Sequence, residues 1–173
     1  LYVTAGHCDE GAADYWYHKN FNQNDCGTGF AVGCIGRRAG TLLANNGSDV
    51  AMMQMADDQD SSSVYANSTP ASGWWWPIQN EGACSSLGMT GAWDCGTVSD
   101  DYYTYNLLGS SDQWYYQLVG ADHNGIAGVK GDSGSPIVRQ ANTGTAIGIA
   151  STTGGAFARF GDAANAFSIS IRT

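Results

Sequence analysis

Short apolar runs broken by glycine, asparagine and serine constrain the fold of this chain more than any other feature. The 173 residues include 24 glycines and 3 prolines, and the breaks recur too often to leave room for long helices. Apolar runs separated by turn residues in this way are typical of β-hairpins. The sequence therefore predicts an all-β protein, built as barrels or as a sandwich.

We expect strands where an apolar or alternating run ends at a turn residue. These runs cover 1–8, 15–21, 30–35, 50–55, 92–98, 102–108, 113–119, 136–139, 145–151 and 166–171. The stretch 56–73 is rich in Asp, Ser and Asn and is the expected surface loop or linker. Residues 141–144 have the composition of a hairpin turn.

Acidic residues dominate the charged side chains. The chain has 16 Asp plus Glu against 7 Lys plus Arg, which gives a formal net charge of −9. A field of this sign repels phosphate backbones and anionic membranes, so we expect no nucleic acid or membrane partner. No apolar stretch approaches the roughly 20 residues that span a bilayer. Since there is neither an initiator methionine nor a signal peptide, we expect a processed or incomplete product.

The five cysteines, in a chain with few charges, indicate an oxidising compartment and therefore a secreted protein. Five is an odd number, so at least one thiol has no partner within this chain. No Cys-x-x-Cys pair occurs, so we expect no structural zinc site, and no other pattern requires a metal or a cofactor.

A glycine-rich turn around Ser133, GDSGSP over residues 131–136, has the backbone that a nucleophilic serine needs. Serine-based hydrolysis requires a hydroxyl, an imidazole that takes its proton and a carboxylate that orients the imidazole. The glycines allow a sharp turn that exposes the hydroxyl, and they leave the N–H groups of Gly131 and Ser133 free to face one oxyanion pocket. Taken alone, such a segment is more often an ordinary hairpin turn.

A histidine and an acid complete the requirement. His7 lies in a small-residue turn, TAGHC, directly after an expected strand, whereas His18 and His123 have no such setting. Asp49 opens an apolar strand, where a buried and unpaired carboxylate would cost several kcal/mol. Asp49 therefore needs a hydrogen-bond donor, and His7 is the natural one.

The motifs TAGHC, DVAM and GDSGSP, in this order, resemble the chymotrypsin-like serine proteases. The chain order His, Asp, Ser separates that family from the subtilisins and the α/β-hydrolases. Residues 84–96, CSSLGMTGAWDCG, are similar to the disulfide hairpin of the bacterial streptogrisin and α-lytic group. The resemblance covers nearly the whole chain from Thr4 to Ile171 and is faint between Asp57 and Gly82.

The resemblance implies two antiparallel, six-stranded Greek-key β-barrels. Residues 1–70 would form the first and carry His7 and Asp49, while residues 71–173 would form the second and carry Ser133 and the specificity pocket. The family places further strands before the histidine, so the first barrel is expected to lack its N-terminal strands in this chain. The chain also stops before the C-terminal helix that the family usually carries.

The resemblance also implies the role of each residue in the chemistry. Ser133 would be the nucleophile, His7 the general base and then acid, and Asp49 the carboxylate that orients the imidazole. The N–H groups of Gly131 and Ser133 would form the oxyanion hole. Asp132 would be buried behind this loop and hold it through an ion pair, although the arginine that the streptogrisin group uses is replaced here by Ser85.

The same resemblance implies the pairing of the cysteines. Cys84 would pair with Cys95 and Cys26 with Cys34, while Cys8 would pair with a cysteine upstream of this chain. The odd number of cysteines is then accounted for.

The resemblance places substrate-binding residues in the segments before and after the nucleophile. They are Ala127, Gly128, Val129, Lys130, Ser151, Thr152 and Thr153. No acid precedes the active loop to bind Arg or Lys, and branched threonines would narrow the pocket mouth. We therefore expect cleavage after small or medium apolar residues, with the strand edge at Ser151 pairing with an extended peptide.

Weaker signals leave two interpretations each. Trp74, Trp75 and Trp76 could stack on sugars or, more commonly, pack between the barrels. The run 57–60 could bind calcium or form a solvated loop, and the sequons at Asn46 and Asn67 matter only in a source that glycosylates them.

The sequence thus predicts a secreted serine endopeptidase that acts on polypeptide substrates. The alternative is a catalytically inactive homologue that acts as an extracellular binding or self-assembling protein. The sequence gives no prediction of the oligomeric state.

Overall fold

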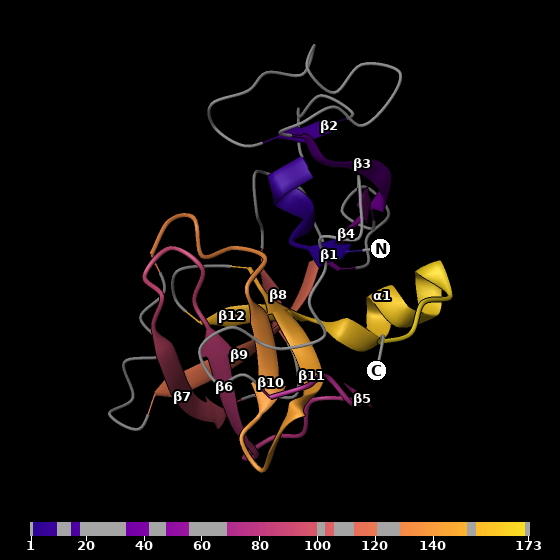
Figure 1. Cartoon of the computed structure of the whole chain (residues 1–173). Helices are drawn as coiled ribbons and strands as arrows, with labels where there is room; N and C mark the ends of the chain where they lie inside the picture. Colours follow the sequence, from indigo (N-terminus) through magenta and orange to yellow (C-terminus); the bar gives the residue numbers. More distant parts are fainter. Residues whose placement is uncertain are drawn as a thin grey trace.

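The structure is a computed structural model that consists mostly of β-strands, with one α-helix in the residues it describes. It describes residues 2–9, 15–17, 34–41, 48–55, 69–99, 103–105, 113–120, 129–151 and 155–171. The strands form a four-stranded sheet from the first part of the chain and an eight-stranded sheet from the rest (Figure 1).

The four-stranded sheet is antiparallel throughout. Its strands lie in the order β1 (Tyr2–Thr4), β4 (Ala51–Met55), β3 (Cys34–Thr41) and β2 (Tyr15–Tyr17). Thr4 of β1 is opposite Ala51 of β4, so the chain leaves β1 at the point where it enters β4. This register brings the turn that carries His7 beside Asp49.

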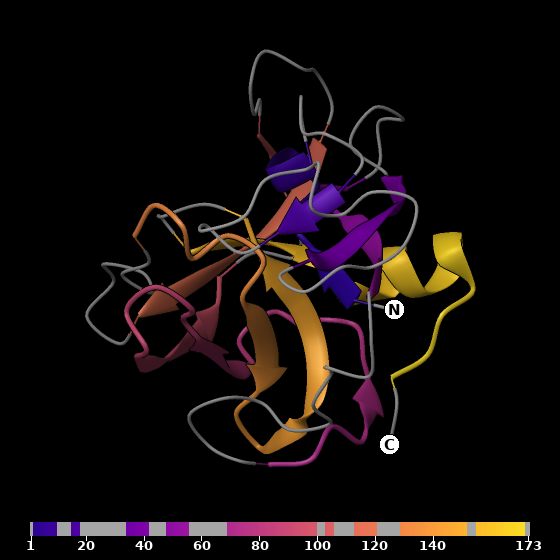
Figure 2. The same ribbon diagram turned by 45° about the horizontal axis from the view of Figure 1, so that its top comes forward.

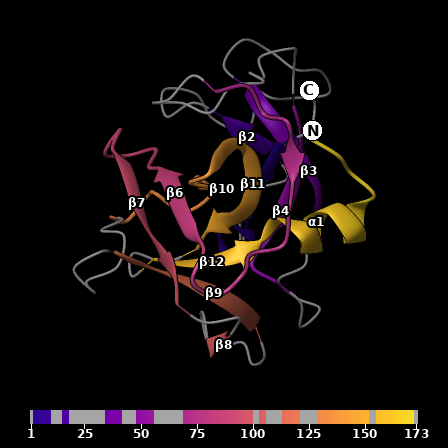
Figure 3. The ribbon, with the colours of Figure 1, turned by 90° about the horizontal axis from the view of Figure 1, so that it is seen from below.

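Six strands of the second sheet pair in a closed circuit, which Figure 3 shows from below. In circuit order they are β10 (Pro136–Arg139), β6 (Gly82–Ser86), β7 (Trp93–Val98), β9 (Gln113–Gly120), β12 (Ala156–Arg159) and β11 (Asn142–Ala150). β5 (Gly73–Trp74) adds to β11 in parallel, and β8 (Tyr103–Tyr105) adds to β9. That the two sheets are Greek-key barrels divided at residue 70, and that the first lacks strands, remain predictions.

The chain consists mostly of β-strands, as expected, but it also contains a helix near its C-terminal end, which was not expected from the sequence. A helix, α1 (Phe160–Phe167), follows β12 and includes the first two residues of the strand expected over 166–171, and residues 168–171 form no strand. Phe160, Ala163, Ala164 and Phe167 recur at helical spacing and place apolar side chains on one face. The helix ends at Ser168, whose φ of 52° is left-handed.

Two apolar clusters organise the molecule. The first fills the closed circuit of strands and contains Ala83, Leu87, Val98, Ile137, Ile147, Ala150 and Phe157. The second joins Ala5 and Val50, which adjoin β1 and β4 of the four-stranded sheet, to Ile149 and Ala158 of the eight-stranded sheet and to the buried face of α1. The second cluster is therefore the seam along which the two sheets meet, with α1 beside it (Figures 1 and 2).

Candidate active site

His7 lies in η1 (Gly6–Asp9), the 3-10 turn that follows β1. The Cys8 N–H closes the turn by donating to the Ala5 carbonyl at 3.2 Å. A Cβ on Gly6 would lie 2.9 Å from the Val50 nitrogen and 3.0 Å from Asp49 Oδ1. Glycine before the histidine is thus what lets this turn approach β4 closely enough for His7 to reach Asp49.

Asp49 is fully buried and, among the described residues, accepts hydrogen bonds from three donors. The His7 backbone N–H donates to Oδ1 at 2.6 Å, and His7 Nδ1–H donates to Oδ2 at 2.6 Å. The Ser151 hydroxyl, from the opposite sheet, also donates to Oδ2. These donors offset the cost of removing a carboxylate from water, and they fix the plane of the imidazole.

The Asp49 carboxylate also controls the charge of His7. Its hydrogen bond to Nδ1 raises the pKa of His7 above the ordinary value of 6.5, the side-chain hydrogen bond with Cys8 acts in the same direction, and partial burial opposes both. A carboxylate only accepts, so Nδ1 carries a proton and Nε2 of the neutral ring is an acceptor. A neutral His7 is therefore oriented to take a proton at Nε2.

Ser133 completes the hydrogen-bonded chain. Its Oγ lies 2.9 Å from His7 Nε2 and 3.4 Å from the Ser151 carbonyl oxygen. It belongs to residues 129–135, which we call the active loop. The next residue, Gly134, has a φ of 91°, and a Cβ there would collide with the Thr4 hydroxyl, so glycine allows the loop to pack directly on β1.

The backbone of the active loop leaves two N–H groups available. In the part of the chain that the structure describes, the amides of Gly131 and Ser133 donate no hydrogen bond, whereas those of Asp132, Gly134 and Ser135 all do. Gly131 has a φ of 104° and is exposed. These two N–H groups lie on either side of Asp132 and close to the Ser133 hydroxyl, so they are suited to donate to an oxygen that becomes negative during a reaction.

Asp132 is buried, as expected, but the expected ion pair is absent from the described residues. Its Oδ1 accepts the Met89 N–H at 2.7 Å and its Oδ2 accepts the Val129 N–H at 2.8 Å. Backbone amides therefore satisfy this carboxylate where the resemblance implied a cation. The sequence could not reveal them, because every residue except proline carries such a donor.

Only part of the expected substrate site lies within the described residues. Val129 and Lys130 are exposed at the start of the active loop, while Ala127, Gly128, Thr152 and Thr153 lie outside the described residues. Ser151 is buried, its N–H donates to the Ala156 carbonyl at 2.9 Å, and its hydroxyl contacts Asp49. Ser151 thus supports Asp49, a contact that no local pattern had indicated.

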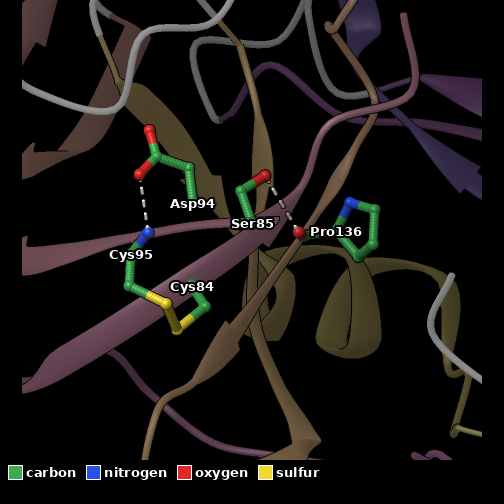
Figure 4. Close-up of a disulfide and its surroundings, with 5 residues drawn as sticks. All are labelled: Cys84, Ser85, Asp94, Cys95 and Pro136. Carbon is green, nitrogen blue, oxygen red and sulfur yellow. Dashed lines mark hydrogen bonds between the residues drawn. A yellow bond between two sulfur atoms is a disulfide. The ribbon is translucent and has the colours of Figure 1, made fainter. Parts of the chain in front are cut away.

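The predicted disulfide between Cys84 and Cys95 is confirmed, with an S–S distance of 2.08 Å (Figure 4). It joins directly opposed residues of β6 and β7. Cys8 forms no disulfide with any residue that the structure describes. The pairing of Cys26 with Cys34 and that of Cys8 with an upstream cysteine remain predictions, because Cys26 and the Cys34 side chain lie outside the description.

The tryptophan cluster packs against the start of α1. The rings of Trp74 and Trp76 meet edge to face at 5.4 Å, Trp74 lies 6.4 Å from Phe160, and the Arg159 guanidinium lies 5.2 Å from the centre of the Trp76 ring. Trp75 is 53% exposed. Two of the three rings therefore have a packing role at this helix.

The remaining weaker signals fall outside the described residues, namely Asn46, Asn67 and the acidic run 57–60. Among the residues that are described, no cluster of three His, Cys, Asp or Glu side chains could hold a metal ion. No helix in the described ranges is long and apolar enough to cross a membrane.

Comparison with known proteins gives structural matches alone. No family model and no curated protein matches the sequence. A glutamic acid-specific serine protease that uses a histidine triad in substrate binding is 20% identical, with a TM-score of 0.70 over 98% of this chain and 85% of its own. Nocardiopsis protease is 21% identical, with a TM-score of 0.71 over 99% and 84%. Thermobifida fusca protease A is 18% identical, with a TM-score of 0.66 over 99% and 83%.

Proposed function

Because the chain has the chymotrypsin-like fold of bacterial serine proteases, we propose that it is a secreted serine endopeptidase with His7, Asp49 and Ser133 as its catalytic residues. The observation that carries the proposal is the continuous chain of hydrogen bonds from Asp49 through His7 to Ser133. Nucleophile, base and orienting carboxylate stand in the order that acyl transfer requires. The Cys84–Cys95 disulfide supports secretion, since such bonds persist in oxidising compartments.

The first half of the reaction forms an acyl-enzyme. Ser133 Oγ attacks the carbonyl carbon of the scissile peptide bond while its proton passes to His7 Nε2. The oxygen that becomes negative accepts hydrogen bonds from the Gly131 and Ser133 amides. The C–N bond then breaks, and His7 gives its proton to the leaving amine.

The second half repeats these steps with water as the nucleophile. His7 takes a proton from the water as its oxygen attacks the acyl carbon, and the same amides hold the oxyanion. The ester bond to Ser133 Oγ breaks, His7 returns the proton to Oγ, and a carboxylic acid leaves. Throughout, Asp49 keeps the proton on Nδ1 and stabilises the imidazolium.

The substrate is a polypeptide in extended form, with a small or medium apolar residue on the acyl side of the cleaved bond. Support for the apolar preference comes from the sequence 127–130, which has no acid, and from Thr152 and Thr153 at the expected pocket mouth. The main chain of the peptide would pair with the strand edge that begins at Ser151. A peptide-library profile dominated by Arg or Lys, or by Glu as in the glutamic acid-specific structural neighbour, would contradict this preference.

Labelling with a fluorophosphonate probe tests the proposed function. We expect one covalent adduct at Ser133, located by mass spectrometry and absent from Ser133→Ala. Ser72→Ala is the matched control, because Ser72 is exposed and distant in sequence from the active loop, and it should label normally. Absence of labelling in the folded protein would favour the alternative, a catalytically inactive homologue that binds other molecules or assembles with itself.

A further inference from the structure

The turn between β6 and β7 lies beside the active loop (Figure 1) and contacts it at three points. The Gly88 N–H donates to the Ser135 hydroxyl oxygen at 3.0 Å, and the next amide, that of Met89, donates to Asp132 Oδ1 at 2.7 Å. The Met89 side chain covers Gly131, where a Cβ would lie 2.6 Å from Met89 Cγ. Two consecutive amides of one turn thus hold side chains that lie before and after the nucleophile.

The turn is closed by hydrogen bonds between its own residues. The Leu87 N–H donates to the Ala92 carbonyl at 2.9 Å, and the Gly91 N–H donates to the Leu87 carbonyl at 2.9 Å. The side chain of Leu87 is buried in the first apolar cluster. The Cys84–Cys95 disulfide links the two strands that lead into the turn (Figure 4). The turn can therefore act as a fixed anchor for a neighbouring segment.

The active loop needs such an anchor because of its glycines. Gly131 and Gly134 have positive φ angles, a region that glycine enters at little cost and also leaves at little cost. The direction of the Gly131 and Ser133 N–H groups then depends on what the loop is fastened to. Asp132 is fastened to Val129 within the loop and to Met89 in the turn, while the Ser135 hydroxyl is fastened to the turn.

We propose that Ser135 is a positioning residue that fastens the oxyanion hole to the β6–β7 turn through Gly88. This inference rests on the proposed function. The Ser135 hydroxyl is buried and acts through the Gly88 amide, at a distance from the reacting atoms. Because oxyanion donors act on charge that exists only in the transition state, losing the anchor lowers kcat and leaves KM nearly unchanged.

The test compares Ser135→Ala with Ser85→Ala. Ser85 is a matched control, since it is also a buried serine, and its hydroxyl donates to the Pro136 carbonyl at 3.3 Å, outside the active loop (Figure 4). For both variants, the measurements are kcat, KM, the free energy of unfolding and the affinity for a peptidyl trifluoromethyl ketone. The hemiketal oxygen of that inhibitor carries the charge that the oxyanion hole binds.

We expect Ser135→Ala to lose about ten-fold in kcat and in ketone affinity, with KM within about two-fold, as for one lost hydrogen bond. Ser85→Ala should lose stability and keep both quantities. Unchanged kcat in Ser135→Ala, or equal losses in the two variants, would overturn the inference.

A double variant, Cys84→Ala with Cys95→Ala, tests the anchor without touching Ser135. Loss of the disulfide should loosen the hairpin and, like Ser135→Ala, lower kcat and ketone affinity at nearly constant KM. Full retention of kcat in this double variant would overturn the inference. This test holds even if Ser135→Ala fails to fold. Fluorophosphonate labelling of the unaltered protein distinguishes failure of the proposed function from failure of this inference alone. If Ser133 is not labelled, the proposed function fails and this inference with it, whereas labelling together with unchanged kcat in the variants overturns this inference alone.

Discussion

The two halves of the candidate site are supported in different ways. The active loop is fastened to its own sheet, by the Met89 amide on Asp132 and by the Gly134 N–H, which donates to the Ala150 carbonyl at 2.8 Å. His7 follows β1 and Asp49 precedes β4 of the four-stranded sheet, and this pair relies on the opposite sheet as well. Ser151 of that sheet supplies one of the three donors to Asp49.

The same asymmetry appears in the packing. The eight-stranded sheet encloses an apolar cluster of its own, whereas Ala5 and Val50, beside His7 and Asp49, are buried in the cluster that both sheets share. We infer that His7 and Asp49, the histidine side of the site, depend more on contact across the seam than the active loop with Ser133, the nucleophile side, does. The predictions that follow test this difference.

The largest effect should come from removing the nucleophile or the base. Because Ser133 and His7 act as one unit across the seam, Ser133→Ala, His7→Ala and the double variant should each lose about 10⁵–10⁶-fold in kcat. The measurement is single-turnover hydrolysis of a peptide substrate by each purified variant. Losses that add in the double variant would mean that the two halves work independently.

The next effect in size concerns the orientation of the imidazole. Asp49→Asn removes the acceptor that fixes the Nδ1 proton, so the ring can adopt the wrong tautomer, and kcat should fall about 10⁴-fold. The free energy of unfolding, measured by urea titration, should fall as well because Asp49 is buried among its donors. A variant that keeps more than a tenth of the activity would contradict the assignment of Asp49.

Gly134→Ala should disturb the contact between the active loop and β1. Its Cβ would collide with the Thr4 hydroxyl, and alanine at a φ of 91° is strained, so we expect a displaced nucleophile and about 10²-fold lower kcat/KM. Thr4→Ala removes the colliding oxygen and should restore part of the activity in the double variant. If activity is not restored, the loss comes from backbone strain in the loop and not from a contact across the seam.

The proposed catalytic residues could be singled out from the sequence because each has a strong local signal. The small-residue turn before His7, the acid at the head of an apolar strand and the glycines around Ser133 are all visible within a few residues. The contacts that support them are not local. The Ser151 hydroxyl donates to Asp49 although the two residues are 102 positions apart in the sequence. The donors to Asp132 are backbone amides, which no residue type in the sequence identifies.

For the fold as well, the sequence predicted the elements that have a clear local pattern. Strands with alternating or apolar runs were recovered, as at β4, β7, β9 and β10. The helix α1 was missed because the sequence pattern predicted no element over 160–165 and placed residues 166 and 167 in a strand, although the helical spacing of the apolar side chains begins at Phe160. Packing of that face against the seam decided between the two patterns.

The pH dependence of activity reports the Asp49–His7 contact. The pKa of His7 is raised by the Asp49 hydrogen bond, and only the neutral ring is a base, so kcat/KM should rise about ten-fold per pH unit up to a midpoint above 6.5. Asp49→Asn removes the carboxylate and should move this midpoint to lower pH. A midpoint that does not move would contradict the electrostatic role given to Asp49.

The same shift predicts the pH dependence of stability. A raised pKa means that the fold binds the His7 proton more tightly than the unfolded chain does. This contribution to stability is fully present below the unfolded value of 6.5 and is lost as the pH rises through the folded pKa. Urea titrations of Ser133→Ala, which cannot digest itself, should show this loss, and His7→Ala should lack it.

The smallest effect should come from Ser151→Ala, the variant that tests the asymmetry most directly. Asp49 would keep both donors from His7 and lose the one from the opposite sheet, so we expect a loss of roughly three- to ten-fold in kcat/KM and about 1.5–3 kcal/mol in the free energy of unfolding. Hydrogen exchange should accelerate in β1 and β4 before it does in β10 and β11, because the contact across the seam is weakened while the closed circuit of strands is not. Equal acceleration in both sheets would show that the histidine side needs no more support than the nucleophile side.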